Sequence, residues 1–361
     1  MRKISTYLLL LIATISTISC KKDDARANDD VINNITDNII IATYSDLDAK
    51  ADLLLTAVNA LKSGGATTDE LTAARAAWVA ARAPWESSEG FLFGPVADNE
   101  IDPNIDTWPL DSIGVDVILS GSVVINKAYI DDSLADENGQ GKKGFHLIEY
   151  LLWGSSSNKT AAQLTARELD YLVAAAESLK GKTAELKTAW ISGGGNFAEQ
   201  LKSNSSRYPS SKAVLVELAE GIRGIAGEVF DSKIQSTLDG LDISLNDGLQ
   251  NEESRFSANT KTDFTNNITS IKNIYLGTYG SIGNSKGLSA VVAAKNVTLD
   301  AKIKTQITEA IAAIQAIGGS TSASYSSALS ADRASIEAAQ AKVETLETTL
   351  RTELAVLVNG L

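Results

Sequence analysis

The sequence predicts a short buried helix around its only histidine, in the run Gly144-Phe145-His146-Leu147-Ile148-Glu149-Tyr150-Leu151-Leu152-Trp153-Gly154. His146 and Glu149 are three positions apart, so they share one face of a helix. Apolar residues cover most of the remaining surface, and a helix that is apolar on nearly every side is buried. We therefore expect an imidazole and a carboxylate to point together into the interior, where each needs a partner.

A metal ion is one partner that would satisfy this pair, because imidazole and carboxylate ligands together suit Zn, Fe or Mn. Two ligands do not hold an ion by themselves, so further acids are needed. The leading candidates are Glu86 and Glu89, which are also three positions apart on an apolar helix. Asp106 and Asp111, in an acidic loop, are the next. The spacing leaves a second interpretation open, in which His146 is hydrogen-bonded to a carboxylate without any ion.

Composition excludes several other kinds of site. Di-iron bundles with paired Glu-x-x-His motifs need two histidines, and so does the His-Glu-x-x-His helix of zinc peptidases. No Gly-x-x-x-x-Gly-Lys-Ser/Thr loop is present to hold a phosphate. The net charge of -13 argues against nucleic-acid binding, which needs basic patches, and it is compatible with attracting cations.

Residues 1–19 are predicted to be a lipoprotein signal peptide. A short basic region is followed by an apolar stretch that is too short to span a membrane. Cys20, the only cysteine, stands at the cleavage position, where we expect its thiol to be acylated and to anchor the chain to a membrane. Ordinary signal cleavage beside a stray cysteine is the alternative. Residues 20–30 are charged and polar, which is typical of a flexible tether.

Helical spacing of apolar residues dominates the rest of the chain, and no stretch shows convincing strand alternation. We expect an all-α protein of two helical bundles: residues 31–205, with the Gly-x-His-x-x-Glu motif, and residues 206–361. Two expected helices end with similar short sequences that terminate in glycine, one at Gly94 and the other at Gly277. This similarity would follow from duplication of one bundle. The main expected helices cover residues 31–62, 68–91, 160–191, 212–238, 252–276, 299–317 and 327–358.

Three further features belong to the predicted site. Residues 96–113 form a long loop rich in Asp, Asn and Pro, in which Trp108 before a proline indicates an ordered anchor. Arg82 precedes Glu86 by four positions, so it could form a helix-surface ion pair or reach inward and orient a carboxylate. Ser257 belongs to a polar segment that could line a cleft or form a solvated helix face.

The motif Gly144-x-His146-x-x-Glu149 resembles the signature of the imelysin-like family, once classed as metallopeptidases and linked to bacterial iron uptake. Other blocks similar to those of the family occur in the same order and cover essentially the whole mature chain. These blocks are Arg75-Ala76-Ala77-Trp78, Phe93-Gly94-Pro95, Ile105-Asp106-Thr107-Trp108-Pro109, Ser254-Arg255-Phe256-Ser257 and Tyr275-Leu276-Gly277.

The resemblance implies two helical bundles with a site near His146 and Glu149, in a cleft between them. It also implies an outer-membrane lipoprotein, on the periplasmic face or the cell surface, that works with other iron-uptake proteins. We expect it to bind iron or an iron-carrying ligand, with Fe, Zn and Ca all candidates for the ion. Catalysis is less expected, because a peptidase metal needs firm ligands, an open position and a base. A zinc-type metallopeptidase and a protein-binding module with a structural His-Glu pair are the alternatives.

Overall fold

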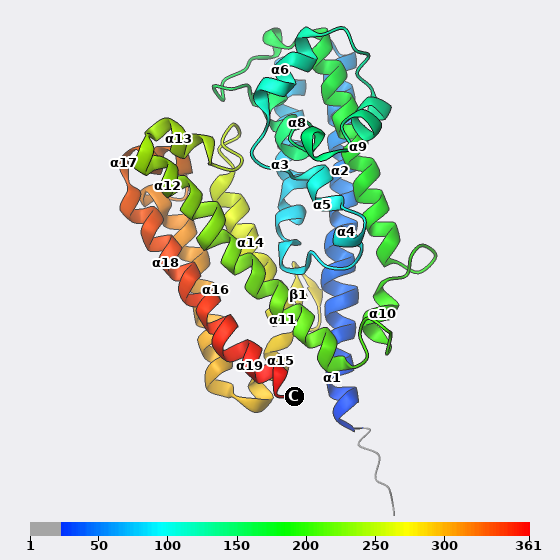
Figure 1. The fold of residues 1–361 in the computed structure, drawn as a ribbon, viewed down its shortest axis with the longest axis vertical. Helices are drawn as coiled ribbons and strands as arrows, with labels where there is room; N and C mark the ends of the chain where they lie inside the picture. Colours follow the sequence, from blue (N-terminus) through cyan, green and yellow to red (C-terminus); the bar gives the residue numbers. More distant parts are fainter. Residues whose placement is uncertain (1–22) are drawn as a thin grey trace, which may run out of the picture.

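The computed structural model describes residues 23–361, and this part of the chain is almost entirely helical (Figure 1). The predicted signal peptide and Cys20 lie outside the described residues. The strands of the described part are β1 (Thr278–Tyr279) and β2 (Ile282–Gly283), which pair as one small antiparallel hairpin. The predicted all-α class is therefore confirmed. No helix of this part is both long and apolar enough to span a membrane.

The first bundle contains the helices that precede residue 205. They are α1 (Asp23–Asn34), η1 (Ile35–Ile40), α2 (Ile41–Ser63), α3 (Thr68–Glu86), η2 (Glu89–Phe91), α4 (Pro95–Asp98), α5 (Ile101–Ile105), α6 (Ser112–Ser120), η3 (Tyr129–Ser133), α7 (Glu137–Gln140), α8 (Gly144–Trp153), η4 (Ala161–Gln163), α9 (Ala166–Trp190) and α10 (Ala198–Lys202). The long helices α2, α3 and α9 pack side by side, and α8 packs against both α3 and α9. Thr67 and Thr165 start α3 and α9 with capping boxes. The indole of Trp78 donates to the carbonyl of Phe145 at 2.9 Å, which fixes α8 against α3.

The second bundle contains the remaining helices. They are α11 (Ser211–Gly227), η5 (Glu228–Ile234), α12 (Gln235–Ile243), α13 (Leu245–Gln250), α14 (Thr260–Leu276), α15 (Leu288–Lys295), α16 (Val297–Ala316), η6 (Ile317–Gly319), α17 (Tyr325–Ala331), α18 (Arg333–Thr349), η7 (Leu350–Leu354) and α19 (Ala355–Asn359). Helix α16 packs against α14 and α18, and α11 packs against α14, α18 and α19. The segment η5 is a π-helical turn that continues α11 directly into α12.

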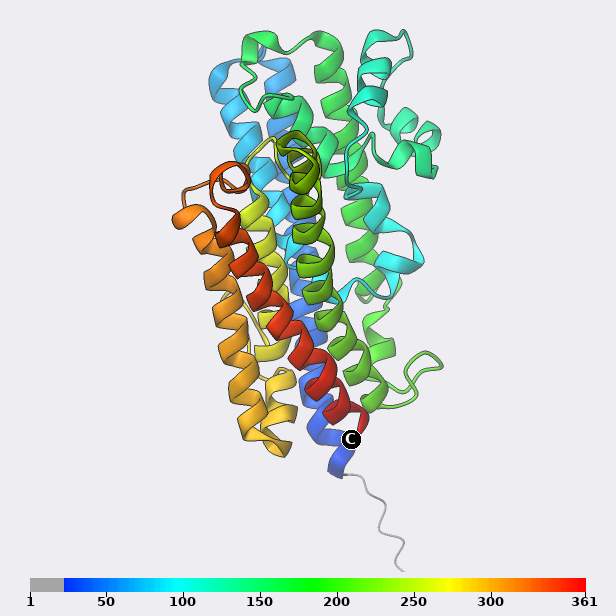
Figure 2. The ribbon, with the colours of Figure 1, turned by 60° about the vertical axis from the view of Figure 1, so that its left-hand side comes forward.

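The two bundles pack closely against each other along α3, η2, α11 and α14 (Figure 2). Gly221 of α11 approaches Gly90 of η2 so closely that a Cβ atom would lie 2.3 Å from the Gly90 carbonyl oxygen. This crossing therefore needs a residue without a side chain. One continuous cluster of buried apolar side chains runs through both bundles. The predicted boundary at residue 205 falls between α10 and α11, while the division into domains and the duplication stay predictions.

Three segments differ from the prediction. Helix α1 includes residues 23–30, most of the expected tether. The loop over residues 96–113 contains the short helices α4 and α5. The expected helix before the hairpin begins only at Thr260, because Ser254 and Ala258 have φ angles of 48° and 58°, which a right-handed helix excludes. The resulting turn before α14 carries polar side chains toward the first bundle.

Candidate functional site

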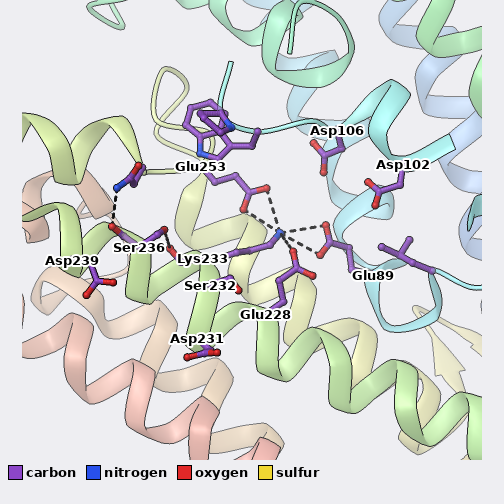
Figure 3. Close-up of a pocket in the computed structure, with 14 residues that line it drawn as sticks. Glu89, Asp102, Asp106, Glu228, Asp231, Ser232, Lys233, Ser236, Asp239 and Glu253 are labelled. Carbon is purple, nitrogen blue, oxygen red and sulfur yellow. Dashed lines mark hydrogen bonds and ion pairs between the residues drawn. The ribbon is translucent and has the colours of Figure 1, made fainter. Parts of the chain in front are cut away.

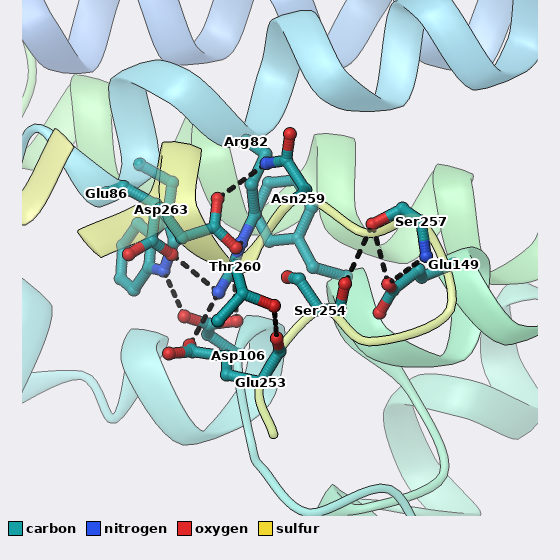
Figure 4. Close-up of polar contacts among 12 residues, drawn as sticks. Arg82, Glu86, Asp106, Glu149, Glu253, Ser254, Ser257, Asn259, Thr260 and Asp263 are labelled. Carbon is teal, nitrogen blue, oxygen red and sulfur yellow. Dashed lines mark hydrogen bonds and ion pairs between the residues drawn. The ribbon is translucent and has the colours of Figure 1, made fainter. Parts of the chain in front are cut away.

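Arg82 lies at the centre of a buried cluster of charged side chains between the two bundles (Figure 4). Its guanidinium pairs with Glu86 at 2.5 Å, with Glu253 at 2.7 Å, with Asp263 at 3.4 Å and with Asp106. Burial lowers the pKa of Arg82, but these carboxylates outweigh burial and raise it well above its ordinary value. Arg82 therefore points inward as a permanent cation and does not form a helix-surface pair.

The partners of Arg82 come from different parts of the fold. Glu86 follows Arg82 by one turn of α3, and Asp106 comes directly after α5. Glu253 belongs to the turn before α14, and Asp263 to the first turn of α14 itself. The cluster thus joins α3 and the α5 loop of the first bundle to α14 of the second bundle.

His146 reaches this cluster because α8 begins close to the end of α5. Gly144, the first residue of α8, has a φ of 72°, and a Cβ atom there would lie 2.2 Å from the carbonyl oxygen of Ile105. Only glycine fits this approach without strain. The contact places the first turn of α8, with the fully buried His146, beside Asp106.

Glu149 holds the imidazole from one side. Its Oε2 atom lies 3.2 Å from His146 Nδ1. Its other oxygen, Oε1, accepts hydrogen bonds from the backbone N–H of Ser257 at 2.8 Å and from the Ser257 hydroxyl at 2.7 Å (Figure 4). A carboxylate that binds one imidazole nitrogen in this way fixes the orientation of the ring and leaves the other nitrogen for a ligand. The geometry favours an orienting role for Glu149.

The second imidazole nitrogen, His146 Nε2, has no partner in hydrogen-bonding geometry although it is buried. It lies 3.2 Å from Asp106 Oδ1 and 3.9 Å from Glu253 Oε1. The ring of Trp108 packs against the imidazole, with centroids 4.7 Å apart. Burial and the charge of Arg82 lower the pKa of His146, but the adjacent carboxylates of Asp106 and Glu149 outweigh them and raise it to about 9.

The cluster holds more buried acids than cations. Its carboxylates are those of Glu86, Glu89, Asp106, Glu149, Glu253 and Asp263, and its permanent cations are Arg82 and Lys233. Burial raises the pKa of Glu86 and of Glu89 well above the ordinary range in spite of the nearby cations. Burial likewise raises the pKa of Asp263 to about 6. A further cation would relieve this shortage of positive charge.

The donor atoms suit a metal ion. Ligand atoms of His146, Asp106 and Glu253 lie within 4.8 Å of one another, and so do those of Glu86, Glu89 and Asp106. Two carboxylates and one imidazole form a donor set that fits Fe or Zn, and a bound ion would displace a proton from the imidazole to take Nε2 as its nitrogen ligand. The residues present therefore fit a bound metal ion.

An acidic cleft of about 470 Å³ opens beside this cluster (Figure 3). Both bundles line it: Asp106 and Trp108 belong to the first bundle, and Lys233 and Glu253 belong to the second. Its other acids are Glu89, Asp102, Glu228, Asp231 and Asp239. His146 itself is sealed, so a ligand that enters the cleft meets Asp106 and Glu253 first.

The structure brings together most of the residues predicted for the site. His146, Glu149, Glu86, Glu89, Arg82 and Asp106 belong to the cluster, and Trp108 and Ser257 contact it. Asp111 is not among the residues that line the cleft. It caps α6 by accepting from Gly114 N at 2.8 Å and pairs with Lys142, so its role is local.

Sequence reasoning did not single out Lys233 or Glu253. Glu253 lies in a polar run that was expected to be helical, and the positive φ of Ser254 turns it toward the first bundle. The chain carries no glycine there to signal a turn. Lys233 lies in the π-helical segment η5, which an α-helical periodicity does not anticipate.

Comparison with known proteins agrees with the fold and the motif. The family model for imelysin matches residues 40–354. The chain belongs to the imelysin family. Iron-regulated protein A of Synechococcus elongatus, a relative of this imelysin-family chain, is 28% identical over 271 residues, which make up 74% of this chain and 69% of the relative.

Two solved structures have the fold of this imelysin-family chain. One is described as an iron-regulated protein A precursor from Parabacteroides distasonis; it is 27% identical, has a TM-score of 0.79, and the match covers 93% of this chain and 95% of that one. The other is an imelysin-like protein from Psychrobacter arcticum, with a TM-score of 0.70 at 15% identity, covering 93% and 96%.

Proposed function

We propose that this protein binds iron, or a ligand that carries iron, in the acidic cleft between its bundles. His146, Asp106 and Glu253 would be the protein ligands, and Glu149 would orient the imidazole. The observation that carries the proposal is the buried Nε2 atom of His146, which lacks a hydrogen-bond partner beside two carboxylates. A buried polar atom is costly unless something satisfies it, and a metal ion in the cleft would do so.

The choice of iron rests on chemistry and on the relatives. Ca²⁺ takes oxygen ligands, so the imidazole favours Fe or Zn over Ca. Two of the similar proteins bear the name iron-regulated protein A, which favours iron over zinc. The surplus of buried carboxylates favours an ion of high charge, because each added positive charge reduces their mutual repulsion.

The cellular setting belongs to the same proposal. We place the protein in the outer membrane as a lipoprotein anchored through Cys20, on the periplasmic face or the cell surface, where it would work with other iron-uptake proteins. The signal-like sequence that ends at Cys20 supports this placement. Labelling cells with a radioactive fatty acid tests it: incorporation should disappear in Cys20→Ala, and equal labelling of that variant would contradict the anchor.

Equilibrium dialysis against Fe²⁺ under anaerobic conditions, ferric citrate, Zn²⁺ and Ca²⁺ tests the binding proposal. Wild-type protein should retain iron, and His146→Ala should retain much less. Asp48→Asn is a matched control, because Asp48 is a buried carboxylate outside the cluster, paired with Lys180 and Lys187. The control should bind as wild type does. Equal iron binding by His146→Ala and the control would remove His146 as a ligand.

The alternatives have less support. A zinc peptidase needs a free base beside the metal-bound water. Glu149 already binds His146 and Ser257, and Glu253 is paired with Arg82 and Lys233. A protein-binding module with a purely structural His-Glu pair leaves the free Nε2 atom unexplained. Peptide cleavage that chelators and His146→Ala abolish would favour the peptidase after all.

A further inference from the structure

The ammonium of Lys233 occupies the place where a cation would enter the cluster (Figure 3). Its Nζ atom donates to both carboxylate oxygens of Glu89, at 3.3 and 3.2 Å, and lies 3.1 Å from Glu253 Oε2. Glu86 Oε2 lies 3.8 Å away. Lys233 thus binds Glu253, which is one of the proposed iron ligands, and it lines the cleft from which an ion would approach.

Lys233 and Arg82 differ in their freedom to move. Arg82 is fully buried, pairs with four carboxylates and lies over the ring of Phe145 at 5.3 Å. The side chain of Lys233 is 10% exposed and reaches its partners from the wall of an open cleft. A flexible four-carbon side chain with a point charge also changes position more readily than a planar guanidinium held at several atoms.

Glu228 offers the ammonium a partner that lies nearer the solvent than Glu89 and Glu253. Glu228 Oε1 lies 3.8 Å from Lys233 Nζ, and its side chain is 49% exposed. The two residues are five apart in the π-helical turn η5, where positions five apart lie one turn apart. The exposed Asp231 and Asp239 line the same wall of the cleft. An ammonium that left the buried acids would therefore meet carboxylates near the solvent.

We infer that Lys233 is a displaceable counter-ion of the site. In the metal-free protein its ammonium binds Glu89 and Glu253; when a metal cation binds Glu253, the ammonium moves toward Glu228. The inference rests on the proposed metal-binding function and describes how that binding would be regulated. Lys233 stabilises the metal-free cluster, and it sets how tightly a cation must bind to replace it. The exchange raises the local charge by at least one unit, because a divalent cation enters as a monovalent ammonium leaves, and this offsets part of the surplus of buried carboxylates.

Affinity measurements on Lys233→Met test this role. Removing the competing charge should tighten binding of Fe²⁺ or Zn²⁺ by about tenfold or more, since like charges side by side oppose each other strongly. Lys180→Met is the matched control, because Lys180 pairs with the remote Asp48 and its loss changes the net charge equally. The control should bind as wild type does.

A second measurement uses the wild-type chain, since Lys233→Met leaves buried acids unpaired and could impair folding. Acetylation by acetic anhydride, read by mass spectrometry, should modify Lys233 slowly without metal and several-fold faster with bound Zn²⁺, while Lys180 stays unchanged. Suppose that wild type binds metal, that Lys233 is acetylated equally slowly with and without metal, and that Lys233→Met binds no tighter than wild type. The inference then fails and the proposed function stands. If neither protein binds metal, both fail. Binding by the variant alone supports the inference.

Discussion

The pH dependence of stability should report the buried imidazole in metal-free protein. The carboxylates of Asp106 and Glu149 overcome burial and the charge of Arg82, and they raise the pKa of His146 from 6.5 to about 9. A group whose pKa is raised on folding contributes stability that is fully present below its unfolded value and is lost as pH rises through its folded value. The interval between 6.5 and about 9 corresponds to about 3 kcal/mol, at roughly 1.4 kcal/mol per pH unit.

Urea unfolding of chelator-treated protein between pH 6.5 and 9.5 measures this loss against His146→Gln, whose amide does not titrate. Across this pH range, the free energy of unfolding should fall by about 3 kcal/mol more in wild type than in the variant. Burial raises the pKa of Asp263 to about 6 and of Glu252 to about 7. The stability that these two acids contribute is lost mainly below pH 6.5, and the loss is the same in wild type and in the variant. Parallel curves for wild type and variant would refute the account of His146.

The remaining predictions concern the supports of the cluster. Arg82→Met should lower the free energy of unfolding by about 3–5 kcal/mol, because it leaves buried acids unpaired; a urea-derived loss below about 1 kcal/mol would contradict this. Gly144→Ala should lower the free energy of unfolding by about 2 kcal/mol or more, because residue 144 has a positive φ and a Cβ atom would clash with the Ile105 carbonyl. An unchanged melting temperature would show that α8 shifts freely. Ser257→Ala should weaken iron binding by up to roughly tenfold, because Glu149 loses the hydroxyl donor and keeps only the backbone N–H of residue 257, and unchanged dialysis affinity would exclude an orienting role for the Ser257 hydroxyl.

Local spacing was sufficient to predict the inward-facing pair. His146 and Glu149 are three apart on an apolar helix, and that pattern alone places both side chains on one buried face. The same reasoning placed Arg82 and Glu86 one turn apart on one helix, but it left open whether Arg82 lies on the surface or points inward. These residues interact within single helices, where periodicity determines which side chains are neighbours.

The contribution of the second bundle was harder to predict, because it depends on two departures from α-helical geometry. Ser254 and Ala258 adopt positive φ angles and turn Glu253 toward Arg82, although neither residue is glycine. The π-helical turn η5 places Lys233 in the cleft. Asp111 was instead predicted to belong to the site because it is an acid in a polar loop, whereas in the structure it caps α6.

In the proposed function, a metal ion binds at Nε2 of His146. Anomalous diffraction at the iron absorption edge, from crystals of wild-type protein equilibrated with iron, locates the ion directly. We predict a peak within coordination distance of His146 Nε2, with Asp106 and Glu253 as further ligands. Iron held only by surface carboxylates, with His146 Nε2 still without a ligand, would contradict the account.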